Sequence, residues 1–332
     1  MKKISITLAI ILTTFTSCDN KFSEVRNLSE FKKTDFIPTM EHKINNKRNS
    51  VYCVTLLYAW DEIREKINLP LEIPEEYPDL TMLNASNSFV DALKSNEYTV
   101  SGNIDGDLIT ANAEFSKSLP FEIKLDDFKN RLVFDGQSVA SFGITEYSDY
   151  QKREMVKIVY YKNDNNFIIK LLPKDKNNEI ILFKTEQSFN SMAEMVNEIE
   201  KLTEIGKTEE KNEKLRWKYH YAGEDEVVIP KFNFNIETNY STLEGNKFKT
   251  EKTSYLIERT WQRTAFILDE SGAEIKSVVE MAAADAEPED DETPKPKKMI
   301  FDSPFLILLK HTNAKNPYFG LWITNSELMI KE

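Results

Sequence analysis

The chain has 332 residues, of which 40% are hydrophobic and 11% aromatic, so it is long enough to bury one large core or two smaller ones. Its net charge of −12 argues against general nucleic-acid binding, which needs a basic face. After residue 18 the sequence contains no apolar run long enough to span a bilayer as a helix.

The N-terminus has the pattern of a targeting segment. Two lysines precede the apolar run ISITLAIILTTF, and the small residues Thr16 and Ser17 precede Cys18. A cysteine at this place resembles a bacterial lipobox, in which Cys18 becomes the acylated N-terminus once residues 1–17 are removed. An ordinary secretory signal with an incidental cysteine is the alternative. We therefore expect an exported bacterial lipoprotein of the cell envelope, on the periplasmic or the surface face of the outer membrane.

The segment after the signal is polar. Residues 18–48 lack long periodicity, which predicts a tether between the lipid and the domain that follows. With Cys18 acylated, Cys53 is the only other cysteine of the sequence, so no intramolecular disulfide is available. Cys53 lies in the apolar run VYCVTLLYAW and is expected to be a buried small hydrophobe. Residues 49–332 are expected to form a single domain.

The domain begins with helical patterns and continues with strands. Apolar periodicity predicts a helix over residues 50–67, with Ser50 as its N-cap, and a second, shorter helix over residues 84–97. The predicted β-elements are a strand starting at 107, hairpins over 130–144 and 153–175, and strands over 178–185 and 226–240. Residues 188–205 predict a helix that packs on the core through a Met/Leu stripe. This order indicates an α+β fold.

The last quarter of the chain combines an apolar strand, an alternating segment, an acidic proline-rich spacer and a second apolar strand. One alternative for the spacer EPEDDETPKPKK is that it is only a solvated connector, because proline and charge both disfavour packing. In an extended chain that starts at Ala273, one face carries only apolar or small residues. That face comprises Ala273, Ile275, Ser277, Val279, Met281 and Ala283. The three charged residues, Glu274, Lys276 and Glu280, lie on the other face.

Six blocks in collinear order resemble the serpin family. They are ANAEFSKSLPFEI, RLVFDGQSVASFGI, MVKIVYYKNDNNFIIKLLPKD, VVIPKFNFN, QRTAFILDESGAEI and FDSPFLILLKHTNAKNPYFGLW. The resemblance covers residues 107–324 and implies a mixed fold with a large central β-sheet and smaller sheets. The chain has little between Trp60 and Ala111, where a full serpin has several helices. The helical part near the N-terminus is therefore expected to be reduced.

The resemblance also implies a mechanism. A serpin offers an exposed loop, here about residues 272–299, to a serine or cysteine endopeptidase, and after cleavage the loop inserts as a strand and drags the acyl-enzyme along. The implied hinge comprises Glu270, Gly272, Ala273, Ile275, Ser277 and Val279. The candidate scissile region comprises Ala286, Glu287, Glu292 and Thr293. A bond at Ala286 would suit an elastase-like enzyme, and the acidic run would suit a Glu-preferring one.

Two readings of the hinge remain open at this point. Bulky Ile275 and charged Lys276 replace small residues and would slow insertion, so the acyl-enzyme could hydrolyse first. The segment could also be a strand already placed in the sheet, in a non-inhibitory surface lipoprotein that serves as a binding or scaffold module. In either reading the protein is expected to be a monomer.

The sequence offers no pattern for catalysis or metal binding. His42, His220 and His311 are isolated, and neither cysteine has metal-ligand spacing with them. The nucleophile-elbow, zinc-protease and phosphate-loop motifs are missing. Ser303 matches a strand-entry position in the resemblance. We therefore expect a protein without catalytic residues, metal or cofactor, which is no enzyme. Its expected partners are a target endopeptidase and, through the N-terminal lipid, a membrane, with no nucleic acid.

Overall fold

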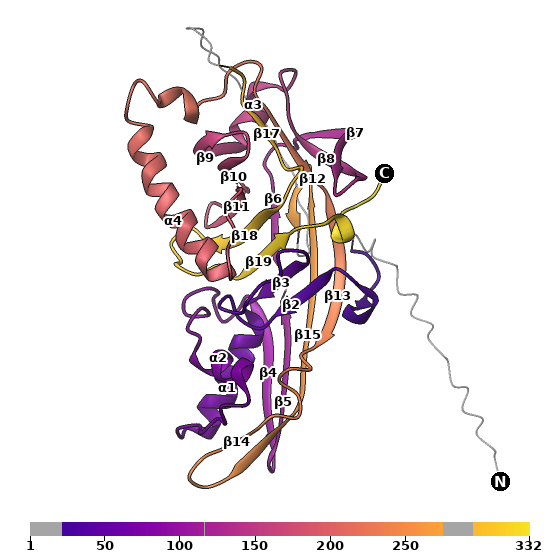
Figure 1. Ribbon diagram of the computed structural model, residues 1–332, viewed down its shortest axis with the longest axis vertical. Helices are drawn as coiled ribbons and strands as arrows, with labels where there is room; N and C mark the ends of the chain where they lie inside the picture. Colours follow the sequence, from indigo (N-terminus) through magenta and orange to yellow (C-terminus); the bar gives the residue numbers. More distant parts are fainter. Residues whose placement is uncertain (1–21, 116, 275–294) are drawn as a thin grey trace, which may run out of the picture.

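The computed structural model describes residues 22–115, 117–274 and 295–332. In these ranges the chain forms an elongated α+β body in which β-sheets carry most of the core and helices cover parts of them (Figure 1). The expected mixed fold, with a large sheet, smaller sheets and a reduced helical part, is confirmed.

The largest sheet is built around the 16-residue strand β15 (Ser254–Asp269). One edge of β15 pairs with β13 and β14, and the other edge pairs first with β5 and then with β16. The other strands of this eight-stranded sheet are β1 (Arg26–Asn27), β4 (Tyr98–Asp105), β5 (Leu108–Phe115), β6 (Ser118–Pro120), β13 (Phe232–Asn239), β14 (Lys247–Lys249) and β16 (Gly272–Glu274).

Two smaller sheets complete the body. The seven-stranded sheet contains, in order, β2 (Thr34–Ile37), β3 (Asn49–Cys53), β19 (Phe319–Ile323), β18 (Phe305–His311), β11 (Asn178–Lys184), β10 (Asn166–Leu171) and β9 (Val156–Asn163). The four-stranded sheet contains β17 (Lys298–Ile300), β12 (Glu226–Pro230), β8 (Gln137–Ile144) and β7 (Asp126–Phe134). Every residue of β3 and β19 is buried, so this part of the seven-stranded sheet lies in the core.

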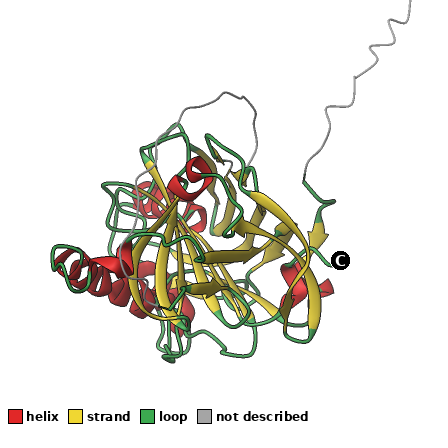
Figure 2. Ribbon diagram, turned by 90° about the horizontal axis from the view of Figure 1, so that it is seen from above, coloured by secondary structure: helices red, strands yellow, loops and turns green. Residues whose placement is uncertain are grey.

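Helices lie on the outside of the strands. α1 (Thr55–Ile67) packs on β4 and β5, with α2 (Pro78–Ala85) beside it. α4 (Met192–Glu209) packs against β9, and Figure 2 shows it at the periphery of the molecule. Short helical segments are η1 (Leu28–Glu30), α3 (Tyr150–Glu154), η2 (Arg216–Tyr219) and η3 (Ser326–Leu328).

The predicted hairpins agree with the structure, whereas two predicted helix boundaries are wrong. Asp135 and Gly136 have φ angles of 48° and 73° in the turn between β7 and β8, which is the pairing that a two-residue hairpin turn requires. Residues 49–53 form β3 instead of the first turn of α1, so Ser50 is no N-cap. The second helix spans Pro78–Ala85 instead of residues 84–97.

The tether predicted over residues 18–48 is wrong for the part that the structure describes. β2 pairs in parallel with β3, and β1 pairs with β13. Phe36, Ile37, Met40 and Ile44 are buried in the main core. This packing was missed because the segment is mostly polar between these four apolar residues.

Cys53 is buried and unpaired, as expected. Cys18 and the signal segment lie outside the described residues. Within the described ranges, every helix is too short or too polar to cross a membrane.

Candidate functional site

The predicted hinge is only partly covered by the structure. Glu270, Gly272 and Ala273 lie in the turn after β15 and in β16. The other predicted hinge residues and the candidate scissile region lie outside the described residues. They are Ile275, Ser277, Val279, Ala286, Glu287, Glu292 and Thr293.

β16 is a strand of the large sheet and lies between β15 and β6. Ala273 pairs with Leu268 on one side and with Leu119 on the other, in antiparallel register on both sides. The Ala273 side chain is 1% exposed and belongs to the core, whereas Glu274 on the opposite face is partly exposed. The start of the hinge therefore already lies in the sheet, with its small residue facing the core.

Gly272 occupies a place where a side chain has no room. Its φ is +133°, and a Cβ atom would lie 2.5 Å from the carbonyl oxygen of Leu119 and 2.6 Å from Cα of Pro120. This close approach lets the chain reverse direction between β15 and β16 while remaining paired with β6. Glycine at this position is a steric requirement of the turn.

Backbone and charged contacts fix the turn before Gly272. The amides of Phe121 and Leu125 donate to the carbonyl oxygens of Ser271 and Glu270, at 2.8 and 2.9 Å. Nζ of Lys231 lies 2.5 Å from Oε2 of Glu270 and 2.7 Å from Oδ1 of Asp127. Burial alone lowers the pKa of Lys231, but the hydrogen bonds to these two carboxylates outweigh it and raise the pKa overall. The turn is thus held by a cationic side chain from between β12 and β13.

The N-terminal part of β15 pairs with β5 instead of β16. From Leu256 to Arg263, β15 pairs directly and in parallel with β5. Between Arg263 and Ile267, the residues Thr264, Ala265 and Phe266 have no partner on this edge of β15 among the described residues. On this edge of β15, β16 therefore pairs with the C-terminal end of the strand and β5 pairs with its N-terminal part.

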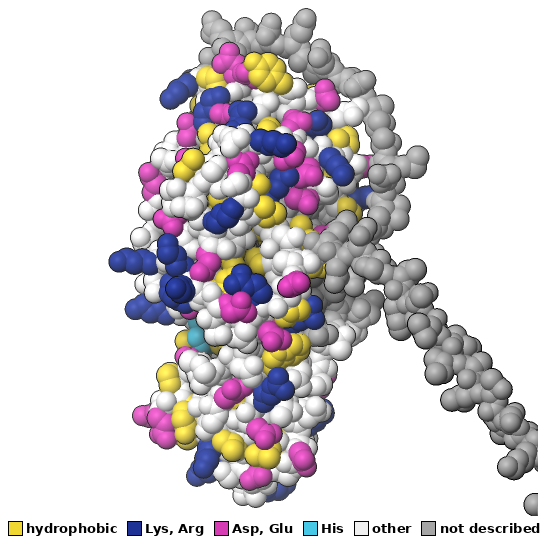
Figure 3. All heavy atoms as spheres, turned by 90° about the vertical axis from the view of Figure 1, so that its right-hand side faces the viewer, with side chains coloured by type: hydrophobic (Ala, Val, Ile, Leu, Met, Phe, Trp, Pro, Cys, Tyr) yellow, Lys and Arg dark blue, Asp and Glu magenta, His cyan; other side chains and the backbone are white. Residues whose placement is uncertain are grey.

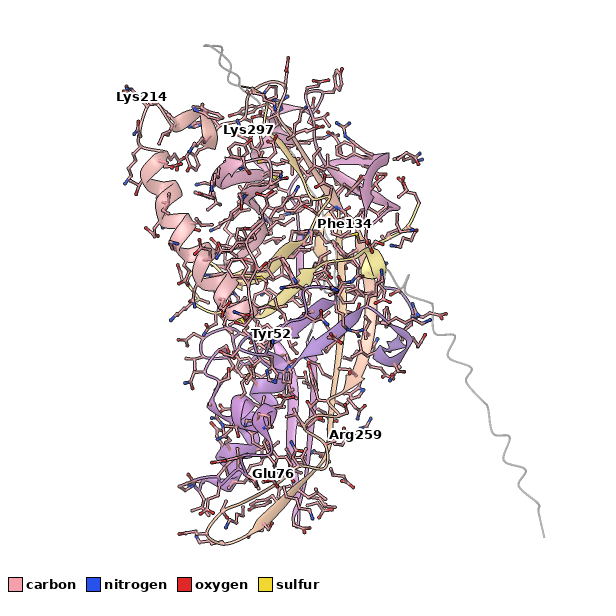
Figure 4. All side chains as sticks on the ribbon, in the orientation of Figure 1. Tyr52, Glu76, Phe134, Lys214, Arg259 and Lys297 are labelled. Carbon is pink, nitrogen blue, oxygen red and sulfur yellow. The ribbon has the colours of Figure 1, made fainter. Side chains whose placement is uncertain are left out.

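The distal end of the candidate loop is anchored by a buried ion pair. Nζ of Lys297 lies 2.5 Å from Oδ2 of Asp225, and the two side chains are only 3% and 1% exposed. The ammonium also donates to the carbonyl oxygens of Trp217 and His220, at 3.2 and 3.0 Å. Lys297 lies near the upper end of the molecule, on the chain that leads into β17 (Figure 4). The alternative of a fully solvated spacer is wrong at this residue.

Searches of protein families and of curated proteins give no match to this chain. Solved structures with similar folds include protease nexin-1 with heparin (TM-score 0.40, 14% identity). They also include Manduca sexta serine protease inhibitor (serpin)-12 (0.37, 12%) and thyroxine-binding globulin with thyroxine (0.33, 14%). In each case 66% of this chain is covered, and it spans 56% of the length of the solved chain.

The six sequence blocks quoted above occupy strands of the sheets in the same order. They contribute β5 with β6, β7 with β8, β9 with β10, β12 with β13, β15 with β16, and β18 with β19. A large sheet, smaller sheets and this strand order are what the serpin resemblance of the sequence blocks implies. In this fold, the segment that begins at β16 and ends at β17 joins the large sheet to the four-stranded sheet.

A buried polar network includes Gln262 of β15. The amide of Gln262 donates to the Cys53 carbonyl oxygen at 3.2 Å and to Thr55 Oγ1 at 2.9 Å, and its own oxygen accepts from the Tyr240 hydroxyl. The network ties β15 to the start of α1. Sequence reasoning missed Gln262, because two of its partners, Cys53 and Thr55, are 209 and 207 residues away. The role of Lys231 was also not predicted, although this residue lies in the block VVIPKFNFN.

His42 and His311 contact neighbouring polar side chains of the fold. Nε2 of His311 lies 2.8 Å from Oε2 of Glu97, and Nδ1 of His42 lies 3.0 Å from the Thr39 hydroxyl. Ser303 lies two residues before β18. The described residues contain no group of three His, Cys, Asp or Glu side chains placed to hold a metal ion.

Proposed function

We propose that the protein is a serpin-like inhibitor of a serine or cysteine endopeptidase. In this proposal the enzyme cleaves the segment after β16, and the freed segment inserts between β15 and β5 before the acyl-enzyme is hydrolysed. The observation that supports the proposal is the pairing of β16, which lies between β15 and β6 directly before the segment that would insert.

The register of β16 supports insertion of the residues that follow. Because Ala273 meets Leu268, an inserted strand that keeps this register turns Ile275, Ser277 and Val279 toward the core. Ser277 would then lie opposite Thr264, whose buried hydroxyl has no hydrogen-bond partner among the described residues. The charged residues Lys276 and Glu280 would face the other side. The alternation seen in the sequence thus matches the core side of the sheet.

The pairing energy also favours insertion. The parallel β5–β15 pairing would be replaced by two new interfaces, one on each side of the inserted strand. Each strand edge satisfies a row of backbone hydrogen bonds, and antiparallel pairing is slightly more stable per residue than parallel pairing. Cleavage releases the constraint that holds the segment to Lys297 and β17, so insertion becomes accessible only after the protease has attacked.

Two measurements test this proposal. The protein is mixed with elastase-like, trypsin-like and Glu-specific proteases, and SDS gels are examined for an adduct that survives denaturation. We expect an adduct with at least one enzyme, and a rise in Tm of about 10 °C or more after loop cleavage, because new pairing adds several kcal/mol. Adducts with none of the enzymes and an unchanged Tm after cleavage would refute the proposal.

Neighbouring positions in the loop provide a matched pair of variants. Ser277→Arg places a charge on the side that would enter the core, whereas Val278→Arg places the same charge on the outer side. We expect Ser277→Arg to be cleaved without forming adduct and Val278→Arg to retain the adduct. Equal behaviour of the two variants would contradict insertion in the register of β16.

One observation favours a second function. The β5–β15 pairing below β16 is continuous from Leu256 to Arg263 apart from one irregularity near Glu258, so insertion requires these strands to separate first. A non-inhibitory serpin-fold protein that acts as a binding or scaffold module would keep this pairing. In that case the loop would be cut as an ordinary substrate, with no adduct and no change in Tm.

We also propose that Cys18 carries lipid and anchors the body in the cell envelope. The amide of Ser23 already donates to Asn233 on β13, at 2.9 Å, so the chain joins the body directly after Phe22. Four residues of at most about 3.6 Å each then separate the lipid from the body, a reach of about 14 Å. A Cys18→Ser variant should lose the lipid mass and leave the membrane fraction. Retention of this variant in the membrane would contradict the proposal.

A further inference from the structure

An exposed aromatic side chain is held on a rigid turn between β8 and α3. Tyr147 is 87% exposed, the highest value among the large hydrophobic side chains of the described residues, and Tyr150 nearby is 45% exposed. Figure 3 shows acidic and basic side chains interspersed with hydrophobic ones over this side of the molecule. Exposed aromatic side chains offer a large contact area to a partner, and tyrosine is enriched at protein interfaces.

The turn itself is fixed by four hydrogen bonds, one of them buried, one partly buried and two exposed. The Thr145 amide donates to the Ser148 hydroxyl at 2.7 Å, and this hydroxyl in turn donates to Asp126 at the start of β7. The Arg153 guanidinium donates to the carbonyl oxygens of Glu146 and Gly223, at 3.0 and 3.1 Å. Tyr147 is therefore displayed on a pre-organised backbone, which reduces the entropy lost when a partner binds.

The turn lies at the same sheet edge as the distal end of the candidate loop. Ile144, the last residue of β8, pairs with Val227 of β12, and Val227 pairs with Met299 of β17. The turn after β8 and the entry to β17 are thus two strand spacings apart, which is about 10 Å. Figure 1 shows α3 beside β17 at the upper end of the molecule. A protein that engages the loop near Lys297 would reach Tyr147 as well.

The surroundings of the two tyrosines are acidic. The exposed carboxylates are those of Glu146, Asp149, Glu154 and Glu224. None of them has an ion-pair partner among the described residues. The nearby Lys152 is paired with Asp126 and Lys298 with Glu226, so Arg153, which donates to backbone carbonyl oxygens of the turn, adds one positive charge to these four carboxylates. Hydrogen bonding to Glu146 raises the pKa of Tyr147, so the ring stays neutral over the physiological range. The two tyrosines and the four exposed carboxylates, Glu146, Asp149, Glu154 and Glu224, are called the Tyr147 surface below.

We propose that the Tyr147 surface is a docking site for the endopeptidase that attacks the loop, and that the enzyme it fits carries lysines or arginines beside its cleft. Aromatic side chains on rigid supports dominate binding energy at protein interfaces, and a complementary charge increases the association rate. The inference rests on the proposed function, because it assigns the loop and this surface to one partner.

The test compares two elastases that cut after the same small residues but differ in net charge, one strongly cationic and one near neutral. For each enzyme, SDS gels give the rate constant for total loss of intact chain, as adduct plus cleaved product. We expect the cationic elastase to react faster, with a difference that disappears in 0.5 M NaCl. The double variant Tyr147→Ala/Tyr150→Ala should slow the cationic enzyme about 10-fold. The rate constant with the near-neutral elastase and the Tm of the variant should both stay unchanged.

Two control variants sharpen the comparison. Tyr147→Phe keeps the ring and should retain most of the rate, and Val90→Ala removes an exposed hydrophobic side chain (48% exposed) from a connection far along the chain. Glu146→Gln/Glu154→Gln should reduce the salt dependence. A rate for Tyr147→Ala/Tyr150→Ala within twofold of the parent, or a loop that neither elastase cuts, would overturn the proposal.

The same gels separate this inference from the proposed function. The fraction of chain that ends as adduct reports trapping, whereas the total rate reports docking. Cleavage without adduct that still depends on Tyr147 would refute the inhibitor and keep the docking surface. Adduct formation at a rate that does not change when Tyr147 is replaced would support the inhibitor and refute the docking surface.

Discussion

Gly272 shows how a single residue determines the start of the candidate loop. Its φ of +133° and the 2.5 Å approach to the Leu119 carbonyl leave no room for a methyl group. We expect Gly272→Ala to lower the free energy of unfolding by about 3 kcal/mol, since backbone strain and steric overlap both act. Gly106→Ala is the control, because Gly106 has φ +63° but no atom within 4 Å of the methyl group that alanine would add. Urea denaturation of both variants checks this, and equal losses would contradict it.

Lys297 carries the second residue-scale prediction. Its ammonium and the Asp225 carboxylate are both buried, so removing one partner leaves a charge without compensation. We expect Lys297→Met to cost about 3–5 kcal/mol in chemical denaturation. The adjacent Lys298→Met should cost under about 1 kcal/mol, because the Lys298–Glu226 pair is largely exposed on the lysine side. Addition of Asp225→Asn to Lys297→Met should recover part of the loss. Similar losses for the two lysine variants would count against a buried anchor.

At the scale of elements, α4 and β9 pack so closely that only glycine fits between them. A Cβ on Gly206 would lie 2.0 Å from the carbonyl oxygen of Val159. Alanine is the better helix former by about 1 kcal/mol, so helix propensity alone predicts that Gly206→Ala stabilises the protein. We expect the opposite sign, a loss of about 2 kcal/mol or more, because α4 must move away from β9. Thermal unfolding that shows a gain would refute this packing.

The elements that sequence reasoning found correctly are those with local signals. The β7–β8 hairpin follows from Asp135-Gly136, and α4 follows from its apolar stripe. β3 was mistaken for part of a helix, since a strand buried on both faces is continuously apolar and short. Its partners β2 and β19 make it a strand, and β19 lies more than 260 residues further along the chain.

At the scale of the whole molecule, one acidic side chain connects distant parts. Glu97 precedes β4, and it contacts Lys117, between β5 and β6, and His311, at the end of β18. Burial alone would raise the pKa of Glu97, but the hydrogen bonds from Lys117, the Lys94 backbone and His311 lower it from 4.5 to about 2. A lowered pKa means that this stabilisation is complete above pH 4.5 and is lost as the pH falls toward 2.

Glu97→Gln should therefore change the acid stability of the protein. We expect the variant to be less stable than the parent by about 2 kcal/mol at pH 6, with the difference shrinking between pH 4.5 and 2. Glu122→Gln, at an exposed 4.0 Å pair with Lys176, should change stability less. Urea denaturation at pH 6, 4 and 3 measures both. A difference between parent and Glu97→Gln that is constant over this range would contradict the assignment.

The sequence by itself determined the order of the strands along the chain and the β7–β8 hairpin. Its resemblance to serpins predicted where the candidate loop begins and ends. These features depend on residues close together in the chain, such as turn pairs, apolar alternation and short blocks. It also predicted that Ala273 and Glu274 lie on opposite faces of a strand, and the structure describes them so. The loop beyond Glu274 stays a prediction.

Only the tertiary structure decided where these pieces lie. β16 pairs with β6, about 150 residues earlier, and Lys297 is buried because Asp225 and two carbonyl oxygens of distant residues surround its ammonium. Residues 34–44 belong to the core for the same reason, since their partners are β3 and the start of α4. Long-range pairing sets the burial of such residues, and neither local propensity nor polarity contains that information.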